Sequence, residues 1–190
     1  NDAIATYVDL LISIAVDGIN YTTVDNIATV VGTSGTGSSI TIPTTITDVN
    51  ATVYTVTTIA NYALANLYSL ISIIIPASVT QISANALNGT TQMTSITVTA
   101  GNTTYKDISG VLFDSTGEKI IAYPAGNTRT SYEISAGVVT IGSRAFYYSR
   151  YLTSVTLEPN SQLTTIESNV FTAADGLISV FSIPSSVTTI

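Results

Sequence analysis

The sequence lacks cysteine, histidine and tryptophan altogether, and it contains a single methionine among 190 residues. Without cysteine there is neither a disulfide framework nor a thiolate metal site. Without histidine the chain lacks the side chain that most often serves as general base and as metal ligand. We therefore expect no cofactor, no metal ion and no catalytic residue.

Charged residues are also scarce: they make up 9% of the chain, against about 25% in a typical protein. Five Lys and Arg residues against twelve Asp and Glu residues give a net charge of −7. Binding to nucleic acid depends on basic groups that neutralise phosphates, and binding to an anionic membrane surface depends on the same groups. The longest apolar run near the start, residues 10–16, is too short to span a bilayer. We expect no nucleic-acid partner and no membrane insertion in this segment.

The polar character of the chain comes from hydroxyl groups, and the apolar character from β-branched residues. There are 33 threonines, 22 serines and 24 isoleucines. Thr and Ile are stiff at χ1 and favour strands, whereas the helix formers Lys and Glu are rare here. The composition predicts a folded, mainly β protein.

The chain is built from repeats. Residues 70–87 read LISIIIPASVTQISANAL, and the same order of apolar positions returns in LTSVTLEPNSQLTTIESNVF at 152–171 and in LISVFSIPSSVTTI at 177–190. Ile59 and Ile82 are 23 residues apart, and Ile141 and Ile166 are 25 apart. A period of about 20–29 residues with Leu and Ile at fixed offsets is typical of a leucine-rich-repeat solenoid, in which neighbouring coils bury each other's apolar edges.

The repeat assigns the core positions. An internal ladder is expected from Ile59, Ile82, Ile141, Ile166 and Ile190, with Ile82 and Ile141 fully buried. A second ladder of small residues is expected from Ala63, Ala86, Ala145 and Val170, and the remaining volume is filled by Leu64, Leu87, Phe146 and Phe171.

The strings IPASVTQISANAL and VVTIGSRAFYYSRYLTSVTLEPNSQLTTIESNVF resemble the BspA-like leucine-rich repeats of bacterial and protist surface proteins. GNTTYKDISGVLFDSTGEKIIAYPAGNTRTSYEI resembles the long variant repeat of that family. The chain departs from the pattern in having no cysteine after the aromatic position and little lysine. The resemblance implies an extracellular or cell-surface protein that mediates adhesion or protein–protein interaction, with a protein or glycan ligand on a host or neighbouring cell.

The predicted fold is a mainly β BspA-like leucine-rich-repeat solenoid with short strands, short helical turns and an inserted β-hairpin. Residues 1–36 are expected to form lead-in strands, with tight turns at Asp17-Gly18 and Asp25-Asn26. Residues 37–190 are expected to form the solenoid. Its long repeat at about 99–134 contains a hairpin that turns at residues 114–118.

Catalysis has few candidates in this sequence. A serine or threonine nucleophile needs a base, and the only amines are Lys106 and Lys119. A glycosidase needs two neighbouring carboxylates, but the four glutamates fall in different repeats: Glu118, Glu133, Glu158 and Glu167. The turn at 114–118 lacks the alternating acids of a calcium loop. We expect that the protein is not an enzyme.

Two surfaces are candidate interaction sites. The first is a turn rich in Tyr and Arg, the residue types enriched at binding hot spots: Arg144, Tyr147, Tyr148, Arg150 and Tyr151. The second is the outward face of the strands, a hydroxyl-rich stripe that one isoleucine interrupts: Ser72, Ile74, Thr97 and Thr156 are its central members. For both surfaces the alternative is an ordinary solvated turn or strand face.

An alternative function is a structural one, in which copies of the chain stack head to tail into a filament or sheath. The sequence stops within a repeat at Ile190, which leaves the apolar layer of the last coil uncovered unless the array continues or a second subunit covers it. Residues 4–16 are apolar and could pair with such an edge. The assembly residues of this hypothesis are Leu10, Ile12, Ile14, Val187 and Ile190.

Overall fold

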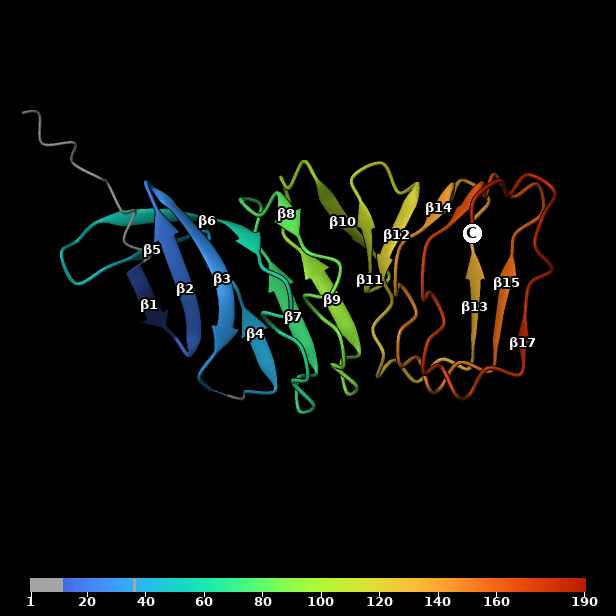
Figure 1. Cartoon of the computed structure of the whole chain (residues 1–190), viewed down its shortest axis with the longest axis horizontal. Helices are drawn as coiled ribbons and strands as arrows, with labels where there is room; N and C mark the ends of the chain where they lie inside the picture. The colour runs from blue at the N-terminus through green and yellow to red at the C-terminus, as the bar shows by residue number, and fades with distance from the viewer. Residues whose placement is uncertain (1–11, 36) are drawn as a thin grey trace, which may run out of the picture.

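The computed structural model describes residues 12–35 and 37–190, which wind into an elongated solenoid of short strands (Figure 1). Within these residues there is no helix, and so none that is long and apolar enough to cross a membrane. The N-terminal strands lie at one end of the molecule and the C-terminal coil at the other.

The first sheet joins the lead-in strands to the first coils. Its order is β1-β2-β3-β6-β5, and β8 pairs with the C-terminal end of β6, at Thr58 and Ile59. Its strands are β1 (Ile12–Val16), β2 (Ile19–Val24), β3 (Ile27–Thr33), β5 (Thr45–Thr47), β6 (Val53–Ile59) and β8 (Gln81–Ile82). The predicted tight turns are confirmed: Asp17 and Gly18 (φ 49° and 76°) join β1 to β2, and Asp25 (φ 53°) joins β2 to β3. Because β3 pairs in parallel with β6, the meander continues directly into the solenoid; the division of the chain at residue 36 stays a prediction.

Two parallel sheets form one long side of the solenoid. The sheet nearer the N-terminus contains β4 (Ser39–Thr41), β7 (Ser72–Ile75) and β9 (Ser95–Val98). The other contains β13 (Ser131–Ile134), β15 (Ser154–Leu157) and β17 (Ser179–Val180). The alternation of Ile or Val with Ser or Thr places one set of side chains in the core and the other on the surface.

The inserted hairpin belongs to the remaining sheet, which runs in the order β10-β11-β12-β14-β16. Its strands are β10 (Tyr105–Ile108), β11 (Val111–Asp114), β12 (Lys119–Ala122), β14 (Thr140–Ile141) and β16 (Thr165–Ile166). The predicted hairpin is confirmed, since β11 and β12 are antiparallel around the turn at 114–118. The Asp114 carboxylate holds that turn, because it accepts hydrogen bonds from the backbone N–H of Gly117 and of Lys119.

The repeat predicted most of the core. Ile59, Ile141 and Ile166 are buried, and so is the whole ladder of small residues: Ala63, Ala86, Ala145 and Val170. Two members of the isoleucine ladder differ from the prediction. Ile190 is 80% exposed, because no coil in the structure lies against it, and Ile82 is only half-buried.

Ile82 is half-buried because the ladder breaks beside it. Tyr105 follows Ile82 by 23 residues and therefore takes the next ladder position, but the chain turns into the hairpin there. The backbone of β8 pairs only with β6, and the N–H of Ile82 donates instead to the Tyr105 hydroxyl at 2.9 Å. The core correspondingly divides into two clusters, one on either side of this position.

The expected short helical turns are wrong. In three turns two residues four apart have positive φ, which a right-handed helix of L-residues does not accommodate, and in the turn at 85–89 the residue with positive φ is Gly89. These pairs are Tyr62 and Asn66, Arg144 and Tyr148, and Asn169 and Ala173.

The turns adopt this backbone because only every second N–H bonds within the turn, as Ala145 does to the Gly142 carbonyl and Tyr147 to the Arg144 carbonyl, both at 3.0 Å. Alternate N–H groups donate to carbonyls of the next coil: Arg144 to Ser168 at 3.1 Å, Phe146 to Val170 at 3.0 Å and Tyr148 to Thr172 at 3.1 Å. A helix would direct these N–H groups along its own axis. The inter-coil bonds therefore satisfy the backbone in a way that a single repeat cannot.

Candidate binding surfaces

The outward side chains of the two parallel sheets lie in straight columns. In the N-terminal sheet Ser39, Ser72 and Ser95 face one another across the strands, and the next column contains Thr41, Ile74 and Thr97. In the C-terminal sheet the first column is Ser131, Ser154 and Ser179, and the second contains Glu133 and Thr156. We call these outward residues the strand face. The repeat period creates the columns, because equal spacing brings the same position of each repeat into register.

The strand face is rich in hydroxyl groups, and its columns contain one charged side chain, Glu133. Thr97 and Thr156 are exposed, while Ser72 and Ile74 are partly exposed. The Ser72 hydroxyl donates to the Ser39 hydroxyl at 3.1 Å. Ile74 is the one aliphatic side chain in the columns of the N-terminal sheet.

The inserted hairpin divides the strand face into two patches. The backbone N–H of Ile96 donates to the carbonyl of Gly110, and that of Val98 donates to the Asp107 carboxylate at 2.8 Å. On the other side the Arg129 guanidinium reaches the Ser109 carbonyl. Residues 107–110, the end of β10 and the turn into β11, therefore lie between β9 and the segment that leads into β13.

The turn at 144–151 that is rich in Tyr and Arg, here called the Tyr/Arg turn, does not form a single cluster of free side chains. The Arg144 guanidinium donates to the Asn85 amide oxygen at 2.6 Å, so it bridges two coils across the break in the ladder. Tyr147 and Tyr148 pack edge to face, with ring centroids 4.6 Å apart. Burial, and then the neighbouring Tyr148, raise the pKa of Tyr147. Arg150 and Tyr151 are exposed.

The residues of the assembly hypothesis differ in their surroundings. Leu10 lies outside the described residues. Ile12 begins β1, and Ile14 is half-buried against the first core cluster. Val187 is partly buried against the second cluster, while Ile190 is exposed.

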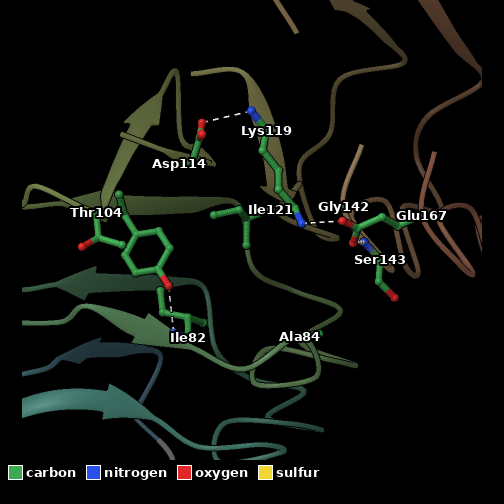
Figure 2. Close-up of a pocket in the computed structure, with 10 residues that line it drawn as sticks. Ile82, Ala84, Thr104, Asp114, Lys119, Ile121, Gly142, Ser143 and Glu167 are labelled. Carbon is green, nitrogen blue, oxygen red and sulfur yellow. Dashed lines mark hydrogen bonds and ion pairs between the residues drawn. The ribbon is translucent and has the colours of Figure 1, made fainter. Parts of the chain in front are cut away.

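A cavity of about 310 Å³ opens at the break in the ladder, and sequence reasoning missed it. Figure 2 shows Ile82 on one wall and Lys119, Ser143 and Glu167 on the other. Tyr105 also lines the cavity, and its hydroxyl is bonded to the N–H of Ile82. These residues come from coils that are far apart in the sequence. The only signal was the 13-residue excess over two periods between Ile82 and Ile141, which marks an interruption but not a cavity.

Glu167 is the carboxylate of this cavity that bonds to other coils. Its side chain accepts from the Lys119 ammonium, with which it forms an ion pair, and from the backbone N–H of Ser143 at 2.8 Å. Burial raises the pKa of Glu167, but the bonds from Lys119 and Ser143 outweigh burial and hold the pKa below its ordinary value. The carboxylate is therefore ionised at neutral pH and joins three coils.

This anchoring predicts an acid-sensitive contribution to stability. Because the folded-state pKa is lowered, the contribution of Glu167 is complete above its ordinary value of 4.5 and is lost as the pH falls through the folded-state pKa. Urea unfolding should show Glu167→Gln less stable than the parent at neutral pH, with the difference shrinking on the acid side of pH 4.5. Glu133→Gln, which removes an exposed glutamate, is the matched control. An equal difference at every pH would contradict the assignment.

The repeats place the chain among known proteins. The family model for the BspA type leucine rich repeat region matches six copies, over residues 34–130 and 122–190. Comparison with functionally curated proteins gives no match.

Two solved bacterial structures share the fold. The pneumococcal vaccine antigen PcpA superposes with a TM-score of 0.56 at 20% identity, covering 93% of this chain and 71% of that one. A leucine-rich repeat protein from Eubacterium ventriosum gives a TM-score of 0.62 at 18% identity, covering 92% of this chain and 66% of that one. The family match spans the coils whose ladders, turns and hairpin are described above, and the chain belongs to the BspA-type leucine-rich-repeat family.

Proposed function

We propose that this chain is a non-catalytic binding segment of an extracellular or cell-surface protein, and that the strand face is its contact surface for another protein. The observation that carries the proposal is the register of the columns, which presents hydroxyl groups at regular intervals over two sheets. Such a surface forms many moderate hydrogen bonds with an extended partner. PcpA, which shares this fold, is a pneumococcal vaccine antigen, and this supports an exposed location.

The residue chemistry of the strand face favours a protein over a charged polymer. The columns contain one ionisable side chain, Glu133, and the whole chain carries a net charge of −7. Long-range attraction of a polyanion is therefore absent. Ile74 supplies an apolar contact between Thr41 and Thr97, and a desolvated apolar centre within a polar surface is the usual arrangement of a protein interface.

The test is binding of the purified chain to an immobilised panel of mammalian extracellular-matrix proteins, measured by surface plasmon resonance. Thr97→Arg places a bulky cation at the exposed centre of the strand face and should abolish binding to the partner that the parent chain captures. Thr80→Arg makes the same change at an exposed position off the strand face and should leave binding intact. Equal binding by both variants, or no partner in the panel for the parent chain, would count against the proposal.

The same assay examines the Tyr/Arg turn. Tyr148→Ala combined with Arg150→Ala removes one partly exposed and one exposed side chain of that turn. Loss of binding in this double variant, with Thr97→Arg unaffected, would transfer the contact surface from the strand face to the turn.

Head-to-tail assembly is the second candidate function. The observation that favours it is the exposure of apolar side chains in the last coil: Ile178, Val180, Ile183 and Ile190. Electron microscopy of the purified chain separates the two candidates, because filaments form only if copies cover this layer. If the chain forms discrete single particles that still bind a matrix protein, head-to-tail assembly is excluded and binding remains the one candidate function.

A further inference from the structure

The cavity beside β8 exists because Tyr105 occupies one position, or rung, of the isoleucine ladder. Its phenol hydroxyl takes the place of the backbone carbonyl that would pair with Ile82. At a regular rung the N–H of the ladder residue donates to a backbone carbonyl of the next coil, as the N–H of Ile166 does to Thr189 at 3.0 Å. At Ile82 the acceptor is the Tyr105 hydroxyl. The Tyr105 ring thus holds the two coils apart where a strand would otherwise close the gap.

The replacement leaves a backbone acceptor without a partner. Elsewhere the carbonyl of a ladder residue accepts from the following coil: Ile59 from Ser83 at 3.0 Å, Ile120 from Gly142 at 2.8 Å and Ile141 from Glu167 at 2.9 Å. No N–H of the described residues donates to the carbonyl of Ile82. The ladder pattern directs this carbonyl toward the next coil, the side on which the cavity lies. The carbonyl is therefore free to accept a hydrogen bond from a group that enters the cavity.

The hydrogen-bonding groups of the cavity include both donors and acceptors. The Tyr105 hydroxyl already accepts from Ile82, so its own proton is free to donate. The Lys119 ammonium has three protons and uses one on Glu167. The Glu167 carboxylate and the Ile82 carbonyl are acceptors. Ala84 and Ile121 add apolar surface to the lining (Figure 2).

The electrostatics of the cavity select a neutral ligand. Glu167 is paired with Lys119, and Asp114 is occupied by three hydrogen bonds within its own turn. Neither a free cation nor a free carboxylate is left to pair with a charged ligand. The net charge of −7 further disfavours an anion.

The size of the cavity limits the ligand to about one ring. Its volume of about 310 Å³ is at the lower end of the range for small-molecule sites, about 300–1,000 Å³. A peptide strand or an oligosaccharide would extend beyond it. A ligand that is neutral, carries hydroxyls able both to donate and to accept, and has an apolar C–H surface is a sugar ring.

We propose that the cavity formed by Tyr105, Lys119, Glu167 and the Ile82 carbonyl binds a single neutral pyranose, either free or as the end of a glycan. The ring hydroxyls accept hydrogen bonds from the Tyr105 hydroxyl and the Lys119 ammonium, and they donate to the Glu167 carboxylate. The ring carbons lie against Ile121 and Ala84. This site is separate from the strand face and does not depend on the proposed protein-binding function.

The test is saturation-transfer NMR and calorimetry of the full chain with D-glucose, D-galactose, D-mannose and N-acetyl-D-glucosamine at millimolar concentration. At least one of these sugars should bind. N-acetylneuraminic acid, which is anionic, should not. Binding of none of the four neutral sugars, or stronger binding of the anionic one, would overturn the proposal.

Variants locate the site. Glu167→Gln and Tyr105→Phe should each weaken binding about tenfold or more, as expected when a hydrogen bond is lost and its partner is left unpaired. Glu133→Gln should leave the affinity unchanged. Because Glu167 and Tyr105 also join coils, Ala84→Phe is the independent variant: Ala84 is exposed at the cavity wall, and the larger side chain should block binding while the thermal midpoint stays unchanged. Full binding by a folded Ala84→Phe variant would exclude the cavity.

The source of the sugar is distinguished by a second probe. A glycoprotein that carries the bound sugar as its terminal residue should compete with the free sugar if the cavity reads glycan ends. Failure of that competition, with the free sugar still bound, assigns the site to the free monosaccharide.

Discussion

Replacing Phe146 with alanine should lower the free energy of unfolding by about 3–5 kcal/mol, the usual range for truncating a fully buried aromatic side chain. Phe146 is completely buried and lies at the centre of an aromatic column. Its ring stacks on Tyr123 with centroids 5.3 Å apart and on Phe171 at 5.4 Å, and Tyr132 lies against it at 5.7 Å. Each partner comes from a different coil or sheet, so the cavity left by the substitution opens between coils rather than within one.

Urea denaturation monitored by circular dichroism measures the effect. Tyr151→Ala is the matched control, since Tyr151 is an aromatic side chain of the same turn region but is 40% exposed; its loss should cost less than about 1 kcal/mol. If Phe146→Ala and Tyr151→Ala were equally mild, the aromatic column would not be the element that holds the C-terminal coils together.

The repeat could be predicted from the sequence because its apolar and polar positions recur at a nearly constant spacing. Alternating apolar and hydroxyl residues mark each strand, and a constant spacing brings equivalent positions into contact. The burial of Ile59, Ile141 and Phe146 and the outward columns at Ser72 and Thr97 followed from these two rules alone.

The predictions were wrong where the structure departs from periodicity. Ile82 was assigned to a continuous ladder, but Tyr105, the next ladder residue, turns its hydroxyl toward Ile82 and the chain leaves for the hairpin. A spacing of 59 residues between Ile82 and Ile141 reports how much chain is inserted but not where it leaves the coil. The cavity could not be predicted for the same reason, because its walls come from coils on both sides of the insertion.

The turns illustrate a limit of local propensity. The segment ending in Ala145-Phe146 has the spacing of a helical turn, and nothing in the side chains of Arg144 or Tyr148 favours positive φ. The left-handed conformation of these two residues costs energy locally, and the hydrogen bonds from Arg144, Phe146 and Tyr148 to the next coil offset that cost. A single repeat contains no information about those bonds.

Gly126→Ala should destabilise the protein by about 1–3 kcal/mol or more, the range for forcing extra atoms into a packed interior. A Cβ atom at Gly126 would overlap the carbonyl carbon of Gln92 and lie 2.6 Å from its oxygen. Both atoms belong to the backbone of the preceding coil, which the bond from the Gly126 N–H to the Met93 carbonyl at 2.8 Å holds close. A side chain could rotate away from the added methyl group, but a backbone fixed by bonds to both neighbouring coils has no such freedom. The upper part of the range is therefore expected.

Gly137→Ala is the matched control for Gly126→Ala. A Cβ atom at Gly137 would meet nothing within 4 Å, and its φ is not positive. Alanine there should be neutral or should stabilise the fold by about 0.4–1 kcal/mol, because it reduces the conformational freedom of the unfolded chain. Thermal unfolding of the two variants beside the parent chain gives the comparison.

The close approach at Gly126 is where the coil after the hairpin returns to the solenoid, so its loss should also separate the two core clusters and make unfolding less cooperative. A Gly126→Ala protein with the midpoint and the single transition of Gly137→Ala would show that this contact does not join the two halves.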